Sequence, residues 1–226
     1  MSELADRSGT EADSLGRAWS ALMRAGTAHT YERGEIMVLA GATDTFVLLL
    51  LDGFAKVTTI DDLDTTVLVD IRASGDVVGE TAAFDNEPRS ATVTAAQHVS
   101  VRRISQEEWL GWVVQYQAAG LAVNRSLAHR SRTAVRRRTE FTRGPVISRL
   151  CRAVLDLIGQ YGRPTPQGLS VRPGLSHAEW GDLIGARERR VQHALQELSA
   201  ARIVSYSRCR LTVHSVPGLR EFAADQ

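Results

Sequence analysis

Residues 79–95 read Gly-Glu-Thr-Ala-Ala-Phe-Asp-Asn-Glu-Pro-Arg-Ser-Ala-Thr-Val-Thr-Ala, a stretch with the chemistry of an anion-binding turn. Gly79 lets the backbone approach a ligand closely, and backbone N–H groups around residues 80–83 can form a concavity that binds an anion. Arg89 adds a planar fork of donors that matches phosphate oxygens, and the Ser90 hydroxyl adds one more donor. The stretch therefore predicts a phosphate site.

Glu80 lies inside this predicted site, although its carboxylate would repel a phosphate. In dinucleotide folds an acidic residue accepts hydrogen bonds from a ribose hydroxyl, and we expect the same role here. Because Glu80 and Arg89 are nine residues apart, the pair suits a ribose closed onto its own phosphate, as in a cyclic nucleotide. The alternative is a solvated loop in which Arg89 pairs with Glu87 or Asp85.

Two short patterns here, Gly-Glu-x-x-x-Phe and Pro-Arg-Ser-Ala, resemble the cyclic AMP receptor protein and fumarate-nitrate regulator (Crp/Fnr) family of bacterial transcription factors. The resemblance extends over nearly the whole chain beyond residue 25. It implies a jelly roll that binds a cyclic nucleotide, with cyclic AMP as the first candidate and cyclic GMP as the second. No metal is expected at this site. The resemblance assigns the ribose to Glu80 and the phosphate to Thr81, Ala82, Arg89 and Ser90 beside Gly79.

Length and composition favour a two-domain cytoplasmic protein. The 226 residues can bury two cores, contain no run of 18 apolar residues, and begin with an acidic, polar segment instead of a secretion signal. Cys151 and Cys209 have no CxxC spacing, so zinc, iron–sulfur and disulfide frameworks lack ligands. This lack also removes the oxygen-sensing branch of the family.

The distribution of charge indicates a sensor joined to a nucleic-acid-binding part. Residues 1–104 carry a formal net charge of −7, residues 105–142 carry +3 and residues 143–226 carry +5. Because phosphate neutralisation dominates affinity for DNA, the basic C-terminal part suits a DNA-binding domain. Basic residues that only decorate a surface are the alternative.

Short β-rich runs separated by glycine turns fill residues 30–103 and predict a sandwich or roll. Residues 3–25 have partly helical spacing, so short helices should flank this first domain of residues 1–104. We predict an α+β chain whose N-terminal domain is a β jelly roll. The predicted strands include residues 36–39, 46–51, 55–60, 66–71 and 99–101.

An enzyme of the cupin type, which shares the jelly-roll architecture, is the alternative from another functional class. The predicted roll has only two histidines, His29 and His98, and no His-x-His cluster, so a catalytic metal lacks ligands. Glu80 as a general base would have no evident acid partner. These features favour a binding domain that is not an enzyme.

Residues 105–142 have a helical pattern that begins with a capping box of Ser105 and Glu108. Sevenfold spacing of apolar residues is typical of a coiled coil, and the resemblance implies a homodimer along this helix. An ordinary core helix is the alternative, because the heptads are few. The apolar stripe consists of Val123, Leu127, Ala134 and Phe141, the last three seven residues apart.

The base end of the predicted ligand site departs from cyclic-AMP-binding relatives, which read adenine with a hydroxyl pair on this helix. A gapless alignment puts Ala134 and Val135 at those two positions, with Thr133 directly before them. It also puts Arg130 where relatives pair an arginine with the ribose-binding glutamate, here Glu80. The phosphate end therefore matches the family, while the preferred base stays open.

Gly144-Pro145 breaks the helix and marks the hinge into a domain of residues 143–226. Residues 146–160 are predicted as a helix and residues 161–173 as a Gly/Pro-rich connection. The tail reads as the two strands of a wing, residues 203–206 and 209–214.

Residues 175–198 read as a helix-turn-helix, with a capping box of Ser176 and Glu179 and a turn at Gly185. Val191, Leu195 and Leu198 should bury one face of its second helix, which starts near Arg187. Arginine reads guanine, glutamine reads adenine and glutamate accepts from cytosine, so this helix can read a major groove. The predicted DNA-binding residues are Ser176, Arg187, Glu188, Arg189, Gln192 and His193.

The sequence thus predicts a homodimeric, ligand-responsive transcription regulator that binds double-stranded DNA at a palindromic operator, with RNA polymerase as a further partner. Two alternatives remain within the same fold. One is a regulator that uses another ligand or none, and the other is a three-helix domain without a DNA role.

Overall fold

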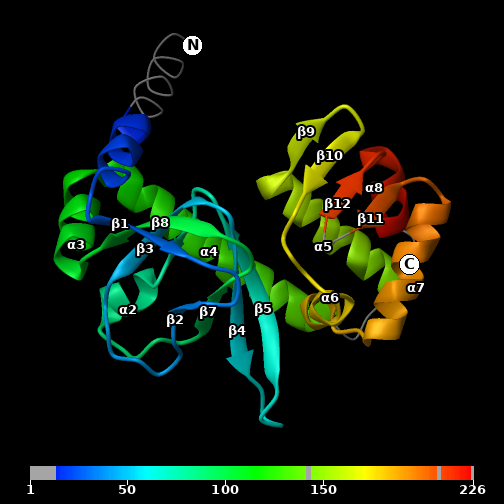
Figure 1. The fold of residues 1–226 in the computed structure, drawn as a ribbon, viewed down its shortest axis with the longest axis horizontal. Coiled ribbons are helices and arrows are strands. Elements are labelled where there is room, and N and C mark those ends of the chain that lie inside the picture. Colours follow the sequence, from blue (N-terminus) through cyan, green and yellow to red (C-terminus); the bar gives the residue numbers. More distant parts are fainter. Residues whose placement is uncertain (1–13, 141–143, 208–209, 225–226) are drawn as a thin grey trace. The chain divides into compact units, whose positions relative to one another are not determined.

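The computed structural model describes residues 14–140, 144–207 and 210–224. These residues form both helices and β-strands, which confirms the predicted α+β class (Figure 1). The chain divides into two compact units of two segments each. The first consists of Met1–Gly53 and Arg72–Thr133, and the second of Phe54–Ile71 and Ala134–Gln226. Within the described ranges, no helix is both long and apolar enough to cross a membrane.

One sheet has the antiparallel order β1-β8-β3-β6. Its central strand β3 (Val47–Asp52) contains four consecutive buried apolar residues, 47–50, as expected where both faces of a strand are covered. The other strands are β1 (Thr27–Tyr31), β6 (Val77–Val78) and β8 (Val99–Ile104).

A second sheet has the order β2-β7-β4-β5. Its strands are β2 (Ile36–Val38), β7 (Thr92–Ala95), β4 (Phe54–Ile60) and β5 (Thr66–Ala73). The five predicted strand runs correspond to β2, β3, β4, β5 and β8. The hairpin of β4 and β5, which the sequence pattern assigned to the domain of residues 1–104, falls within the second compact unit. The domain boundaries at residues 104 and 142 stay a prediction.

Helices cover the core of the first unit, which is rich in tryptophan. Residues 14–22 are helical, and the Trp112 Nε1–H of α3 (Gln106–Gln115) donates to the Ala18 carbonyl at 2.8 Å. The predicted capping box of Ser105 and Glu108 starts α3. The helix pattern over residues 105–142 is interrupted at Tyr116, after which α4 (Gln117–Glu140) begins.

The second unit holds α5 (Val146–Tyr161), as predicted, and a sheet of order β11-β12-β10-β9. The prediction of an irregular connection at residues 161–173 is wrong, because two of these strands lie there. Pro164 suits β9 because β9 is an edge strand, where a missing N–H costs no ladder bond. The strands are β9 (Arg163–Thr165), β10 (Gly168–Val171), β11 (Val204–Ser207) and β12 (Arg210–Val213).

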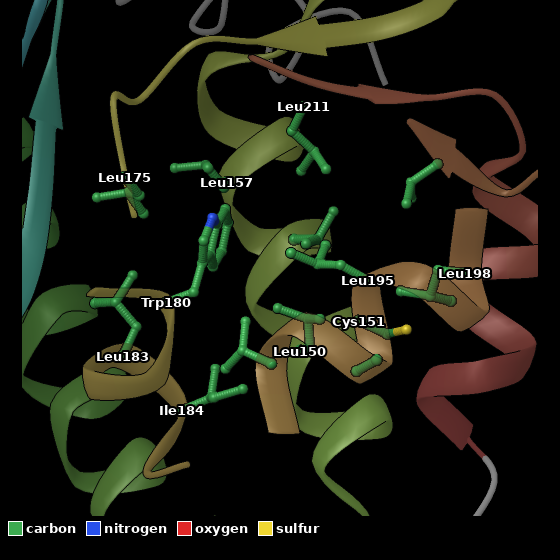
Figure 2. Packing of buried hydrophobic residues seen from close by; sticks show 14 of the residues in the cluster. Leu150, Cys151, Leu157, Leu175, Trp180, Leu183, Ile184, Leu195, Leu198 and Leu211 are labelled. Atoms are coloured by element: carbon green, nitrogen blue, oxygen red, sulfur yellow. The ribbon is translucent and has the colours of Figure 1, made fainter. Parts of the chain in front are cut away.

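The core of this unit forms around α5, α6 (His177–Ile184) and α7 (Glu188–Ala200), with α8 (Val216–Ala224) packed beside α5. Figure 2 shows Trp180 and Cys151 among leucines from several elements. Burial raises the pKa of the Cys151 thiol to about 12, so this cysteine stays a neutral, unreactive core residue at physiological pH.

Candidate ligand and DNA sites

Gly79 precedes α2 (Glu80–Asp85) and has a left-handed backbone, with φ of 83°. A Cβ atom here would collide with Nη1 of Arg89 and lie 2.9 Å from the Phe46 carbonyl oxygen. Glycine is therefore required twice, for its positive φ and for the close approach of Arg89.

The first turn of α2 offers backbone donors to an anion. The helix makes its first internal bond from the Ala83 N–H to the Gly79 carbonyl, at 3.3 Å, so the preceding amides belong to the unpaired start of a helix. Glu80 and Ala82 are buried, while the Thr81 and Ser90 side chains are exposed. The structure thus brings the predicted backbone donors together, with the two hydroxyls at the surface.

Arg89 is 4% exposed and holds a fixed position. Its Nε and Nη2 donate to Asp44 Oδ1 at 2.8 and 2.5 Å. Nη1 donates to the Gly79 carbonyl at 2.7 Å, and Nη2 donates to the Phe46 carbonyl at 2.6 Å. Four of the five guanidinium N–H groups are therefore engaged, which leaves one for a phosphate.

Asp44 is the site residue that sequence reasoning missed. The alternative of a solvated loop expected Arg89 to pair with Glu87 or Asp85, but the structure pairs it with Asp44 instead. This carboxylate comes from the loop between β2 and β3, 45 residues earlier in the chain, and is 43% exposed. An acidic residue in the glycine turn at residues 41–46 was the only available signal.

Phe46 braces the arginine at this site. The guanidinium carbon of Arg89 lies 4.8 Å from the centre of the Phe46 ring, and that of the exposed Arg103 lies 4.0 Å from it. Cation–π attraction to two arginines therefore holds the ring in place and steadies the Phe46 carbonyl that accepts from Arg89.

The predicted contact between Arg130 and Glu80 is confirmed. Nη2 of Arg130, on α4, donates to Oε1 of Glu80, at the start of α2. Both side chains are largely buried. Because the pair fixes one carboxylate oxygen, Glu80 keeps its second oxygen for another donor such as a sugar hydroxyl.

Further along α4 the predicted base-reading residues differ in exposure: Thr133 is half-buried, while Ala134 and Val135 are exposed. Neither Ala134 nor Val135 has a side-chain hydroxyl to donate. Contacts of these three residues with a base therefore stay a prediction.

One residue of the predicted dimer stripe on α4 is unavailable to a partner helix. Val123 is buried in the tryptophan-rich core of its own unit and Leu127 is half-buried against that core, so the pairing of the remaining stripe residues stays a prediction. Phe141 lies outside the described residues. A different heptad face is exposed, made of Leu121, Ala128 and Val135 and termed here the outer α4 face.

The helix-turn-helix is confirmed in its local detail. Ser176 and Glu179 form the capping box of α6, and Gly185 ends this helix with a left-handed φ of 62°. Gly181 is required because a Cβ there would collide with the Ala186 carbonyl of the turn. Arg149 of α5 donates to the carbonyls of Ile184 and Gly185, which caps the C-terminal end of α6.

Helix α7 presents the predicted polar face. Arg187 is its N-cap, so the helix begins where the sequence predicts. The buried face consists of Val191, Ala194, Leu195 and Leu198. The exposed residues include Arg187, Glu188, Arg189, Gln192 and His193, all expected to read DNA, and Arg190, which was not.

The predicted wing is confirmed as an antiparallel pair of β11 and β12, although it forms half of a larger sheet. Arg210 is exposed on β12, whereas Arg208 and Cys209 lie outside the described residues. Ser176 accepts the Glu179 N–H at 3.2 Å, so its hydroxyl caps α6, and its contact with DNA stays a prediction.

Family models of known proteins match both the N-terminal β-sheet region and the C-terminal helix-turn-helix region. The family model of the cyclic nucleotide-binding domain matches residues 28–116, and that of the Crp-like helix-turn-helix domain matches residues 148–222. The chain is 22% identical over 169 residues, 75% of each protein, to a CRP-like cAMP-activated global transcriptional regulator of Mycobacterium tuberculosis.

Solved structures share the fold. FixK2 from Bradyrhizobium japonicum has a TM-score of 0.74 at 15% identity, covering 88% of this chain and 98% of its own. CLP from Xanthomonas campestris, a c-di-GMP responsive global regulator, has a TM-score of 0.64 at 18% identity and covers 88% and 99%. The chain therefore belongs to the Crp/Fnr family, as a transcription regulator with a cyclic nucleotide-binding domain and a helix-turn-helix domain, and is not an enzyme.

Proposed function

We propose that this regulator binds a cyclic nucleotide, with its phosphate at the first turn of α2 and Arg89 and its ribose on Glu80. The observation that carries the proposal is the convergence of Gly79, Arg89 and the Glu80–Arg130 pair at one helix start. Cyclic AMP is the first candidate, because the relative from M. tuberculosis is described as cAMP-activated.

The electrostatics of the site favour modest affinity. Each of its two arginines already has a carboxylate partner, Asp44 for Arg89 and Glu80 for Arg130. A phosphate would therefore meet a nearly neutral cluster, and its charge would be stabilised by the α2 amides and the remaining Arg89 N–H.

Calorimetric titration with cyclic AMP and cyclic GMP tests this proposal. Arg89→Gln should reduce the binding free energy of the nucleotide by about 2 kcal/mol or more, because the buried phosphate would lack its cationic partner. Arg33→Gln, which removes a charge from an exposed position, is the matched control and should bind like the parent. Equal affinity of Arg89→Gln and parent would overturn the phosphate assignment.

The DNA-binding half of the proposal is a homodimer that binds a palindromic operator through α7. The outer α4 face supports the dimer, since two exposed apolar residues there, Leu121 and Val135, share heptad spacing with Ala128. Two copies related by a two-fold axis would present their α7 helices to two half-sites. RNA polymerase is the further partner that this role implies.

A second candidate is a regulator of the same fold that responds to another ligand. It is favoured by the residues at the predicted base end, Ala134 and Val135, which cannot donate to adenine. The structural relative CLP, a c-di-GMP responsive regulator, is a precedent for ligand change in this fold. This candidate would be favoured if the protein binds its operator but calorimetric titration detects no binding of cyclic AMP or cyclic GMP.

A further inference from the structure

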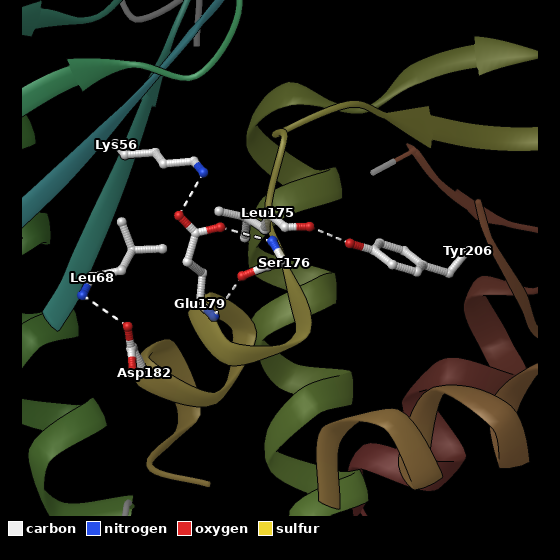
Figure 3. Close-up of polar contacts among 7 residues, drawn as sticks. All are labelled: Lys56, Leu68, Leu175, Ser176, Glu179, Asp182 and Tyr206. Carbon is white, nitrogen blue, oxygen red and sulfur yellow. Dashed lines mark hydrogen bonds and ion pairs between the residues drawn. The ribbon is translucent and has the colours of Figure 1, made fainter. Parts of the chain in front are cut away.

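Lys56 is the only lysine among the 226 residues, and it joins the β4–β5 hairpin to the helix-turn-helix. Its Nζ lies 2.5 Å from Glu179 Oε1, and the two side chains are only 18% and 27% exposed (Figure 3). The other oxygen of Glu179 accepts the Ser176 N–H at 2.7 Å. Burial alone would raise the pKa of Glu179, but the hydrogen bonds from Lys56 and Ser176 lower it, so the Glu179 carboxylate is ionised at neutral pH.

A second contact attaches the same hairpin one turn further along α6. The backbone N–H of Leu68, on β5, donates to Asp182 Oδ2 at 3.1 Å (Figure 3). The Leu68 and Ile71 side chains are buried in the hydrophobic cluster that contains Trp180 of α6. Hairpin and helix are therefore held together by an apolar contact flanked by two polar ones.

The attached hairpin is acidic, whereas DNA-binding surfaces are basic. Residues 54–71 contain one lysine and four aspartates, a net charge of −3, against +5 for residues 143–226. Asp61 Oδ1 accepts the N–H groups of Leu63 and Thr65, both at 2.9 Å, which orders the turn that carries three of these aspartates. Such a turn, fixed to the helix-turn-helix unit, lowers the positive potential that attracts DNA phosphates.

We propose that the Lys56–Glu179 and Leu68–Asp182 contacts form an autoinhibitory clasp, which holds the acidic hairpin on α6 and lowers affinity for the operator. The inference rests on the proposed DNA-binding role of α7. Because coupling between two equilibria is reciprocal, a clasp that weakens DNA binding when closed must open more often when DNA is bound.

Lys56→Met is the decisive variant, because it keeps the apolar stem and removes the ammonium group. Simple electrostatics predicts weaker DNA binding after the loss of a positive charge. The clasp predicts the opposite, an operator affinity about tenfold higher without nucleotide, a factor in the usual range of allosteric coupling. Equal or weaker binding by Lys56→Met, measured by fluorescence anisotropy, would overturn the inference.

Glu179→Gln tests the other side of the pair, since glutamine still suits the third position of a capping box. It should also bind the operator more tightly, and the double variant should gain little more than Lys56→Met alone. The matched control is Glu108→Gln, which removes the same charge from the same position of the α3 capping box. It should bind like the parent.

Acylation of the single lysine measures clasp opening directly, by mass spectrometry of the Lys56 peptide. The rate of Lys56 acylation should rise several-fold in Glu179→Gln and in the parent with saturating operator, but stay unchanged in Glu108→Gln. A rate that neither change alters would overturn the clasp. If neither the parent nor the variants bind DNA, the proposed function is wrong. If all of them bind the operator equally well, the proposed function stands and only the autoinhibitory clasp is refuted.

Discussion

Arg89 and Asp44 form an ion pair that the proposed phosphate would have to share. The guanidinium group is buried and bonded to two carbonyls, so it cannot turn toward a ligand without losing those bonds. The carboxylate is partly exposed and is free to yield its place. Asp44 therefore stabilises a buried arginine and, if the proposed site is correct, would also compete with phosphate for it.

Asp44→Asn should separate these two effects. Loss of the competing charge should tighten nucleotide binding by about fivefold, the scale of a partly exposed ion pair. The same change should lower Tm by about 2–4 °C, because a buried guanidinium loses its partner. Calorimetry and thermal unfolding measure the two quantities, with Asp85→Asn on the exposed side of α2 as the control. Weaker nucleotide binding by Asp44→Asn would mean that Asp44 positions Arg89 for the phosphate.

Two exposed arginines of the helix-turn-helix domain should act differently on DNA. Arg189 is early on α7 and should read a base edge, so Arg189→Ala should cost roughly 1–3 kcal/mol at one operator position and relax the preference there. Arg210, on β12, should contact a DNA phosphate, so its loss should weaken binding to all DNA sequences alike and reduce the salt dependence of that binding. Binding to single-base operator variants at two salt concentrations tests both. An Arg189→Ala protein with unchanged base preference would show that α7 docks in another register.

At the scale of elements, α4 has two apolar faces with different tasks. Val123 and Leu127 pack on the core of their own unit, and the outer α4 face of Leu121, Ala128 and Val135 is exposed. Heptad spacing alone identified an apolar stripe but could not tell which stripe the chain itself would cover. That choice depends on the core that covers Val123, which includes Ala18 and Val47 from distant parts of the chain.

Val135→Asp should therefore weaken the dimer, because it puts a charge into an apolar seam. We expect the dimer dissociation constant to rise at least about tenfold, and sedimentation velocity measures it. Val114→Asp is the control, since Val114 is 79% exposed on α3 and outside the outer α4 face. A Val135→Asp protein as dimeric as the parent would exclude this face as the interface.

Local signals explain which elements could be predicted from the sequence. The capping boxes at Ser105 and Ser176, the turn at Gly185 and the buried face of α7 depend on residues within one turn of each other. Strands β9 and β10 were missed because their glycine and proline content indicates a loop, whereas β9 pairs with β10 and β10 pairs with β12 in the folded sheet. The Arg89–Asp44 pair was missed for the same reason, since it joins distant loops.

In the molecule as a whole, the β4–β5 hairpin takes part in a sheet and in a separate hydrophobic cluster. Its strands belong to the sheet β2-β7-β4-β5, while its residues pack in the hydrophobic cluster of the helix-turn-helix. A regulator needs such shared elements, because a ligand changes DNA affinity only through a part whose equilibrium both sites bias.

A cyclic nucleotide held by Arg89 should change the affinity of this regulator for its operator. The most direct test is fluorescence anisotropy of a palindromic operator titrated with parent and Arg89→Gln, each with and without saturating cyclic AMP. We expect cyclic AMP to shift the operator Kd of the parent by about 5- to 150-fold and to leave that of Arg89→Gln unchanged. A parent whose operator Kd is the same with and without cyclic AMP, or an Arg89→Gln protein that responds as the parent does, would contradict it.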